Sequence, residues 1–383
     1  MVSAPLVDFS PALRMAITAL VIALMPLSWV WLRQRGADRR TRLAALTTLT
    51  LFLTFDLIVF GAFTRLSDSG LGCPDWPGCY GAMSPFHART EIDAAQTASA
   101  FGPVTWAKAW IEMIHRYLAM TVGVLILVIT AFAWAERKRL PYSPWWPTLT
   151  LLWVVVQGLF GKYTVTLKLY PAVVTAHLLG GLALLALLAL QHAHVRAEAS
   201  ALPARLRGLA FAALAALVVQ IALGGWVSTN YAVLACTGFP ACNGQWWPAM
   251  DFQTGFTLLR ELGRAGHGGL LEFDALVAIQ MAHRLFAIVA TLALATLSWK
   301  LWRSSEGRTH RFGAVLALLL LAQLASGLSN VVLGWPLVAA LGHSAGAAAL
   351  VLTMVLLLAR STVPQATRFP ARQAASTPPR SLA

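Results

Sequence analysis

Nine long apolar stretches constrain what this chain can fold into. Each is close to the roughly 20 residues that an α-helix needs to cross the hydrocarbon core of a bilayer. With 58% hydrophobic and only 11% charged residues, the chain of 383 residues does not have the composition of a water-soluble domain. We therefore predict an all-α integral membrane protein. The predicted spans are roughly 12–32, 43–64, 109–135, 146–163, 172–193, 208–228, 276–302, 312–334 and 337–360.

The positions of the basic residues predict how the chain crosses the membrane. Of the 29 Lys and Arg, 19 lie in five segments and only 7 lie in the four alternate segments. Because cytoplasmic loops are enriched in Lys and Arg, the first set is predicted to be cytoplasmic, together with the C-terminus. The net charge of +14 is therefore topogenic, and no basic aromatic motif indicates nucleic-acid binding. The cytoplasmic set comprises 33–42, 136–141, 194–207, 300–311 and 360–383, and the outer set comprises 65–108, 162–171, 229–275 and 335–337.

The two ends of the chain differ from its middle. Residues 1–42 are predicted to form a transmembrane anchor and a basic loop, because the stretch 12–32 lacks a small-x-small cleavage site and is followed by RQRGADRR. Asp8 and a lone Arg14 do not make an Arg-rich transit peptide, which favours a bacterial inner membrane over a mitochondrial one. The tail 361–383 is rich in Pro, Ala, Ser and Arg and is predicted to be disordered and cytoplasmic.

An internal repeat divides the remaining eight spans into two halves. LGCPDWPGCYG (71–81) matches LACTGFPACNG (234–244), and IEMIHRYLA (111–119) matches IQMAHRLFA (279–287). In addition, 20 positions separate Gln157 from His177 and Gln323 from His343. We predict two tandem pseudo-symmetric four-helix bundles, 43–200 and 201–360. Because four is an even number of spans, the two copies have the same orientation and are related by an axis along the membrane normal.

Four histidines recur at matching positions within the predicted spans. His115, His177, His283 and His343 each lie about five to seven residues inside the outer end of a span, so all four share one depth. A core histidine bonded to a neighbouring helix is the alternative for any one of them. Two imidazoles facing each other across a bundle suit the two axial positions of haem iron better than zinc, which prefers four ligands. The pattern therefore predicts two haem sites.

Charged residues accompany these histidines. Arg116 and Arg284 directly follow a histidine in each copy, and they could pair with haem propionates or extend to the outer surface. Lys162 and Lys168 are secondary candidates for propionate pairing. Glu112 shares the helix face of His115, but the matching residue in the second copy is Gln280. Glu112 is therefore a candidate acid or base, with structural pairing to Arg116 as the alternative.

All four cysteines lie in predicted outer loops, where an oxidising compartment permits disulfides. Each pair would close a ring of seven residues, and the pairs are Cys73 with Cys79 and Cys236 with Cys242. A structural staple worth about 2 kcal/mol is one interpretation, which we favour for the second pair. For the first pair, which lies above the half that contains Glu112, a redox or relay role is an equal alternative.

Taken together, these motifs resemble those of the haem A synthase family over roughly residues 43–360. The resemblance rests on GAFTRLSDSGLGCPDWPGC, EMIHR, TAHLLGG, MAHR and GHSAGA, and on cysteine pairs in both outer loops. It implies an enzyme that oxidises the C8 methyl group of haem O to the formyl group of haem A. The helix at 12–32 is additional to the family's usual eight.

The resemblance also implies roles for single residues. His115 and His177 would bracket the substrate haem O, and His283 and His343 would ligate a resident haem b. Glu112 would be the family's acidic residue beside the substrate. A prenyltransferase that makes haem O is a possible partner. Two non-enzymatic functions remain as alternatives. A dihaem electron-transfer protein would use the same histidines but has no need of Glu112. A haem transporter would need discontinuous helices, for which Gly158, Gly161, Gly224 and Gly225 are only weak signs.

Overall fold

The computed structural model describes residues 10–99, 102–140, 142–196, 202–266 and 268–362. Within these ranges the regular structure is helical, and nine helices are long and apolar enough to cross a membrane. The predictions of an all-α membrane protein and of an extra N-terminal helix are therefore confirmed. The nine helices are α1 (Ser10–Arg33), α2 (Arg39–Leu66), α4 (Trp106–Ala135), α5 (Trp145–Thr166), α6 (Pro171–Arg196), α7 (Ala204–Thr229), α9 (Phe273–Trp302), α10 (Gly307–Val332) and α11 (Leu337–Thr362).

Two helices begin earlier on the outer side than the apolar pattern predicts. In α4, the Thr105 hydroxyl caps the N-terminus by accepting a hydrogen bond from the Lys108 amide, so helical hydrogen bonding starts before the apolar run. The first turn of α9 likewise contains the polar Asp274. As a result, His115 and His283 lie nine and ten residues inside their helices rather than five to seven. Hydropathy reports the span of the bilayer, whereas a capped helix continues beyond it.

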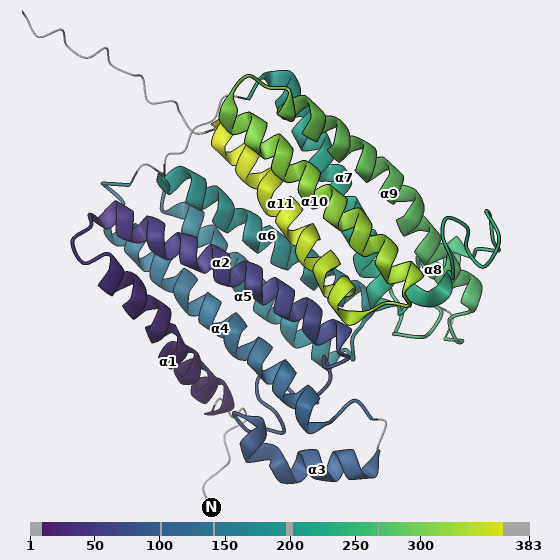
Figure 1. The fold of residues 1–383 in the computed structure, drawn as a ribbon. Coiled ribbons are helices and arrows are strands. Elements are labelled where there is room, and N and C mark those ends of the chain that lie inside the picture. The colour runs from purple at the N-terminus through teal and green to yellow at the C-terminus, as the bar shows by residue number, and fades with distance from the viewer. Residues whose placement is uncertain (1–9, 100–101, 141, 197–201, 267, 363–383) are drawn as a thin grey trace, which may run out of the picture.

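The spanning helices pack in the same pattern in both halves of the chain. In the first half, α2 packs against α4 and α6, and α5 packs against the same two helices. In the second half, α7 packs against α9 and α11, and α10 packs against those two. Helix α1 packs against α4 and α2, at the edge of the molecule (Figure 1), and contributes no member to either four-helix set.

The two halves meet along α6 and α11, which lie side by side at the centre of the molecule (Figure 1). Helix α6 also contacts α7, and α11 contacts α2, as a two-fold axis between the halves requires. Near the outer ends of α2 and α7, Arg65 donates a hydrogen bond of 2.5 Å to the carbonyl of Ser228, a residue 163 positions later in the chain. This is the same offset that aligns the two cysteine motifs, so equivalent residues contact each other on the axis.

A continuous apolar core fills the space between the halves. It is built from small and branched residues whose close contacts, rather than transfer from water, hold helices together inside a bilayer. Helices α5 and α10 occupy equivalent positions at the periphery of the molecule, and only 17% and 11% of the residues in their apolar spans are buried. Fully buried members of the core include Leu185, Leu188, Ala189, Ala210, Ala213, Leu297, Leu301, Ala348, Met354 and Leu357.

The outer connections contain short helices that the hydropathy pattern does not predict. The first holds η1 (Pro85–Ala88) and α3 (Arg89–Ala98), which lies beyond the outer ends of the spanning helices (Figure 1). The second holds η2 (Val233–Ala235) and α8 (Phe252–Gly255). On the opposite side, α11 includes Ser361 and Thr362, the first two residues of the predicted tail, and 363–383 lie outside the described residues.

Candidate haem sites and the cysteine loops

Each of the four histidines lies against a glycine of a neighbouring helix. A methyl group added at Gly61, Gly224 or Gly327 would lie 2.9, 2.9 or 3.0 Å from the ring of His115, His283 or His343, closer than real side chains pack. At Gly161 the distance to His177 would be 3.6 Å. The absence of a side chain at Gly61, Gly224 and Gly327 lets three of the imidazoles lie between the helices.

The surroundings of the imidazoles fit haem. The Nδ1 atom of His177 is buried without a hydrogen-bond partner, and the ring of Phe60 stacks on His115 with centroids 6.3 Å apart. Among the residues that the structure describes, no group of three or more His, Cys, Asp and Glu side chains could hold a metal ion. A zinc site with its usual ligand number is therefore not formed there, whereas a pair of imidazoles meets the axial requirement of haem iron.

The second half surrounds its histidines with polar side chains. The amide nitrogen of Gln220 lies 3.1 Å from His283 Nδ1. The amide nitrogen of Gln323 lies 3.2 Å from His343 Nε2, and Ser326 Oγ lies 3.1 Å from His343 Nδ1. None of these three residues was singled out for this role from the sequence. The repeat of Gln followed four residues later by Gly, at 157/161, 220/224 and 323/327, is a signal that points to the two glutamines but not to Ser326.

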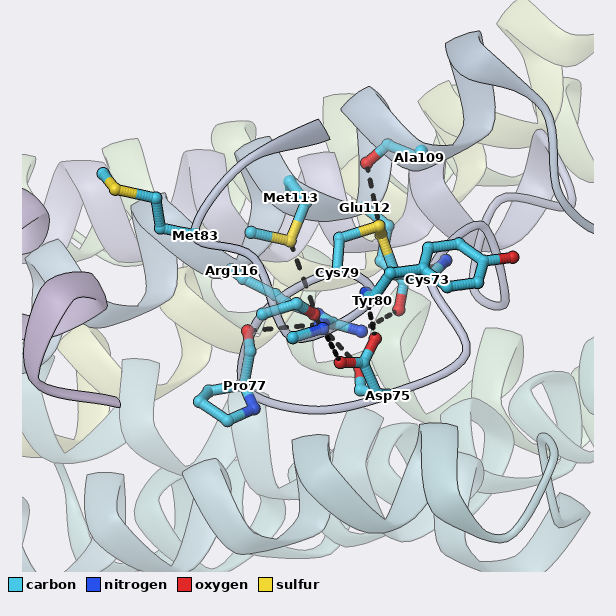
Figure 2. Close-up of a disulfide and its surroundings, with 12 residues drawn as sticks. Cys73, Asp75, Pro77, Cys79, Tyr80, Met83, Ala109, Glu112, Met113 and Arg116 are labelled. Carbon is cyan, nitrogen blue, oxygen red and sulfur yellow. Dashed lines mark hydrogen bonds and ion pairs between the residues drawn. A yellow bond between two sulfur atoms is a disulfide. The ribbon is translucent and has the colours of Figure 1, made fainter. Parts of the chain in front are cut away.

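Glu112 joins α4 to the first cysteine loop (Figure 2). Its Oε1 atom accepts a hydrogen bond of 2.5 Å from Arg116, one helical turn further along α4. Its Oε2 atom accepts a hydrogen bond of 2.8 Å from the backbone amide of Cys73. The carboxylate and the guanidinium are 4% and 8% exposed. The pairing with Arg116 that we considered from the sequence is therefore present in the structure.

Arg116 and Arg284 hold the two cysteine loops in the same way. Arg116 donates hydrogen bonds to the carbonyl oxygens of Asp75 (2.9 Å), Pro77 (3.2 Å) and Gly78 (Figure 2). Arg284 donates to those of Cys236 (3.0 Å), Gly238 (3.1 Å) and Ala241 (3.3 Å), and two of these match the positions of Asp75 and Gly78 in the repeat. Each guanidinium therefore anchors a loop above its histidine pair, a role that we did not predict.

Both predicted disulfides are present. Cys73 is bonded to Cys79 with an S–S distance of 2.10 Å, and Cys236 to Cys242 with a distance of 2.01 Å. All four cysteine side chains are buried, and the described part of the chain contains no free cysteine. In the first loop, Asp75 accepts hydrogen bonds from the amides of Tyr80 and Gly81, both at 2.6 Å. The first disulfide therefore lies directly above Glu112 in a loop with an internal hydrogen-bond network.

The two halves differ at the position of Glu112. In the second half Gln280 occupies that position, and its Oε1 atom is buried without a hydrogen-bond partner. Arg284 lacks the carboxylate that Arg116 has, and its Nε atom is also buried without a partner. The ammonium group of Lys162, which follows Gly161 on α5, lies 6.0 Å from the ring of Tyr163. A buried acid at this position thus accompanies only the first of the two histidine pairs.

The fold and the paired sites define a class of protein: a duplicated, multi-pass membrane protein with a histidine pair in each half. Residues 44–355 match the family model described as cytochrome oxidase assembly protein. The chain is 39% identical to the haem A synthase of Shewanella oneidensis over 319 residues, which cover 82% of this chain and 95% of that protein. It is 30% identical to the haem A synthase of Beijerinckia indica, covering 82% and 91%, and 26% identical to that of Shouchella clausii, covering 76% and 86%. The chain therefore belongs to the haem A synthase family, as its motifs predicted.

Proposed function

We propose that this protein is a haem A synthase, which oxidises the C8 methyl group of haem O to a formyl group in the membrane. The observation that carries the proposal is the buried Glu112 carboxylate, which lies on α4 one turn before His115 and is absent from the second half. A dihaem electron-transfer protein has no need for such a difference between its halves. Family membership and the duplicated histidine pairs support the same conclusion.

In this proposal each histidine pair has its own task. His115 and His177 bracket the substrate haem O in the first half, and His283 and His343 ligate haem b in the second half. Converting a methyl group to a formyl group through an alcohol adds one oxygen atom, which water can supply, and releases four protons and four electrons. Haem b, held by His283 and His343, would supply a redox group for those electrons. The glycines that face the imidazoles leave room for the ligand rings between the helices.

Glu112 acts on the substrate in the first half. Because its carboxylate is fixed by Arg116 and by the Cys73 amide, it is held in one orientation beside the histidine pair. A carboxylate so placed can take up a proton from the substrate or stabilise a positive charge that develops on it. Arg116 and Arg284, at the outer ends of the two sites, are also suitably placed for haem propionates, in addition to holding the loops.

The orientation of the protein completes the proposal. The clustering of Lys and Arg supports a cytoplasmic C-terminus, and the sequence features of the N-terminus favour a bacterial inner membrane. Both disulfides then face the oxidising side, where they are stable. A membrane-bound prenyltransferase that makes haem O is the partner that this substrate implies.

Product analysis tests the proposed function. Membranes that contain the protein are incubated with haem O, and the extracted haems are identified by mass. We expect haem A and its alcohol intermediate, and membranes with the His115→Ala variant should form neither. If haem O is recovered unchanged while the protein carries a normal complement of haem b, the protein is an electron carrier instead.

A further inference from the structure

The hydrogen bonds around His343 define how its ring is held. Ser326 Oγ donates to the carbonyl oxygen of Gln323 at 3.1 Å, so its hydrogen is already used. The same oxygen lies 3.1 Å from His343 Nδ1 and can therefore only accept from that atom. His343 thus carries its proton on Nδ1 and its lone pair on Nε2, the atom that would bind a metal once it gives up its present hydrogen bond. Gln323 donates to that lone pair at 3.2 Å.

The first half lacks this arrangement at the equivalent position. The repeat places Gln157 opposite Gln323, Gly161 opposite Gly327 and His177 opposite His343, all with the same offset. With that offset, Phe160 occupies the position of Ser326. A phenyl ring cannot accept a hydrogen bond as a hydroxyl does, and His177 Nδ1 is buried without a partner.

His283, the other histidine of the second half, has a different partner. The amide nitrogen of Gln220 lies 3.1 Å from His283 Nδ1, and the corresponding residue of the first half is Leu57. An amide nitrogen can only donate, so Gln220 makes His283 Nδ1 an acceptor, and of these two histidines only His343 has a hydrogen-bond acceptor at Nδ1. An acceptor at Nδ1 fixes the orientation and protonation of a ligating imidazole and makes its other nitrogen a stronger ligand.

We propose that Ser326 is a positioning residue that locks His343 onto the iron of the resident haem, and that its replacement by Phe160 leaves His177 as the exchangeable ligand of the substrate haem. This inference rests on the proposed function. A ligand locked in this way suits a haem that only passes electrons, since its coordination does not change. An exchangeable ligand allows the substrate iron to accept a small molecule without the loss of the haem from its site.

The test uses two variants of the same shape. Ser326→Thr keeps the hydroxyl group and Ser326→Val removes it, so a difference between them reports the hydrogen bond and not the packing. The purified holoprotein is reduced and exposed to carbon monoxide, and the rate and extent of binding to haem b are followed by absorption spectroscopy. Ser344→Ala is the control, because the Ser344 hydroxyl binds its own helix at the carbonyl of Ala340.

We expect Ser326→Val to bind carbon monoxide roughly tenfold faster than Ser326→Thr, within the 10- to 100-fold range typical of losing the partner of a metal ligand. The midpoint potential of haem b should rise in the Val variant, because a less basic ligand stabilises the oxidised iron less. The Thr and Ser344→Ala variants should behave as the unmodified protein does. Loss of haem from the Val variant alone would also support the inference. Equal behaviour of the Val and Thr variants would overturn it.

The reciprocal change tests the first half. Phe160→Ser gives His177 the hydroxyl partner that it lacks, and after reconstitution with haem O the substrate haem should bind carbon monoxide roughly tenfold more slowly. An unchanged rate would overturn the assignment of His177. His343→Ala separates this inference from the proposed function. If His343→Ala keeps its haem b, the assignment of His343 as a ligand fails. If His343→Ala loses haem b but Ser326→Val and Ser326→Thr bind carbon monoxide equally fast, only the role of Ser326 is refuted.

Discussion

The phenol of Tyr231 donates a hydrogen bond of 2.7 Å to Asp68 Oδ1, although the two residues are 163 positions apart and occupy equivalent places in the two repeats. Equivalent residues can meet only at the axis that relates the two halves. The ammonium group of Lys108 lies 3.2 Å from the other carboxylate oxygen of Asp68. These contacts connect the outer ends of the two bundles, above both histidine pairs.

Removing the phenol should weaken this connection in a pH-dependent way. Burial alone would raise the pKa of Asp68, but the hydrogen bond from Tyr231 and the charge of Lys108 hold that pKa below its usual value. A lowered pKa stabilises the folded protein above the ordinary pKa of Asp, and this contribution is lost as the pH falls through the lowered value. We expect Tyr231→Phe to lower the free energy of unfolding by about 1 kcal/mol at pH 7 and by less in acid.

Thermal unfolding in detergent at several pH values measures this effect. The control is Tyr163→Phe, at the outer end of α5, whose side chain is 45% exposed and which should unfold as the unmodified protein does. A stability loss in Tyr231→Phe that stays constant from pH 7 into the acid range would show that Asp68 is not involved.

Glu112→Gln writes the residue of the second half into the first and removes one charge at almost constant size. If Glu112 acts as a base or stabilises charge, formation of haem A should fall by a factor on the order of 10² or more, with haem content nearly unchanged. If Glu112 serves only as the partner of Arg116, its loss leaves a buried charge, at a cost of roughly 3 kcal/mol or more. Haem content, stability and activity should then fall together.

The matched control for Glu112 is Gln280→Glu, which places a carboxylate one turn before Arg284. It should pair with that guanidinium and leave haem A formation intact, because in the proposed function the substrate binds in the first half. Measurements of haem A formation and of haem content on both variants distinguish the two roles. Full activity with normal haem content in Glu112→Gln would refute both, and with them the assignment of the first half as the catalytic one.

The resident haem should report the loss of its ligands. If His283 and His343 bind haem b, the purified protein should have the absorption spectrum of a low-spin, six-coordinate haem. His283→Ala should abolish this spectrum or convert it to a high-spin form, because one axial ligand is missing. His87→Ala, in the outer loop beside Ser84, is the control and should leave it unaltered. An unchanged spectrum in His283→Ala would mean that the haem is bound elsewhere.

Three of the glycines beside the histidines, Gly61, Gly224 and Gly327, should tolerate no side chain. In Gly224→Ala the new methyl group would lie 2.9 Å from His283 Cε1, so the ring must move, and haem content should fall on the order of tenfold. Gly208→Ala lies on the same helix with no heavy atom within 4 Å of the new methyl group, and it should bind haem normally. Haem extracted per mole of purified protein measures both. Equal haem content in the two variants would contradict a requirement for glycine at 224.

The orientation of the chain can be tested with reporter fusions. Reporters near residues 38, 138, 200, 306 and 370 should be active in the cytoplasm, because these positions lie in the segments rich in Lys and Arg. Reporters in the loops that contain Cys73 and Cys236 should be active outside. A cytoplasmic position for either loop would remove the basis for both disulfides.

Much of the architecture could be predicted because it depends on local features of the chain. The length and hydropathy of a span report the thickness of the bilayer, so all nine membrane helices were found. The repeated spacing of the cysteines indicated both disulfides, since only six positions separate the members of each pair. Helix caps such as Thr105 are not visible in the hydropathy pattern, so the number of residues between the start of the helix and His115 was underestimated.

The sequence by itself determined which residues are available in each half: two histidines, an arginine, a cysteine loop, and an acid in the first half alone. Only the tertiary structure decided what these residues contact. Arg116 lies about 40 positions from the loop carbonyls that it binds, and Ser326 acts on His343 from the neighbouring helix. Such contacts depend on how two helices are rotated against each other, and hydropathy does not specify that rotation, because in a bilayer close packing and hydrogen bonds set it.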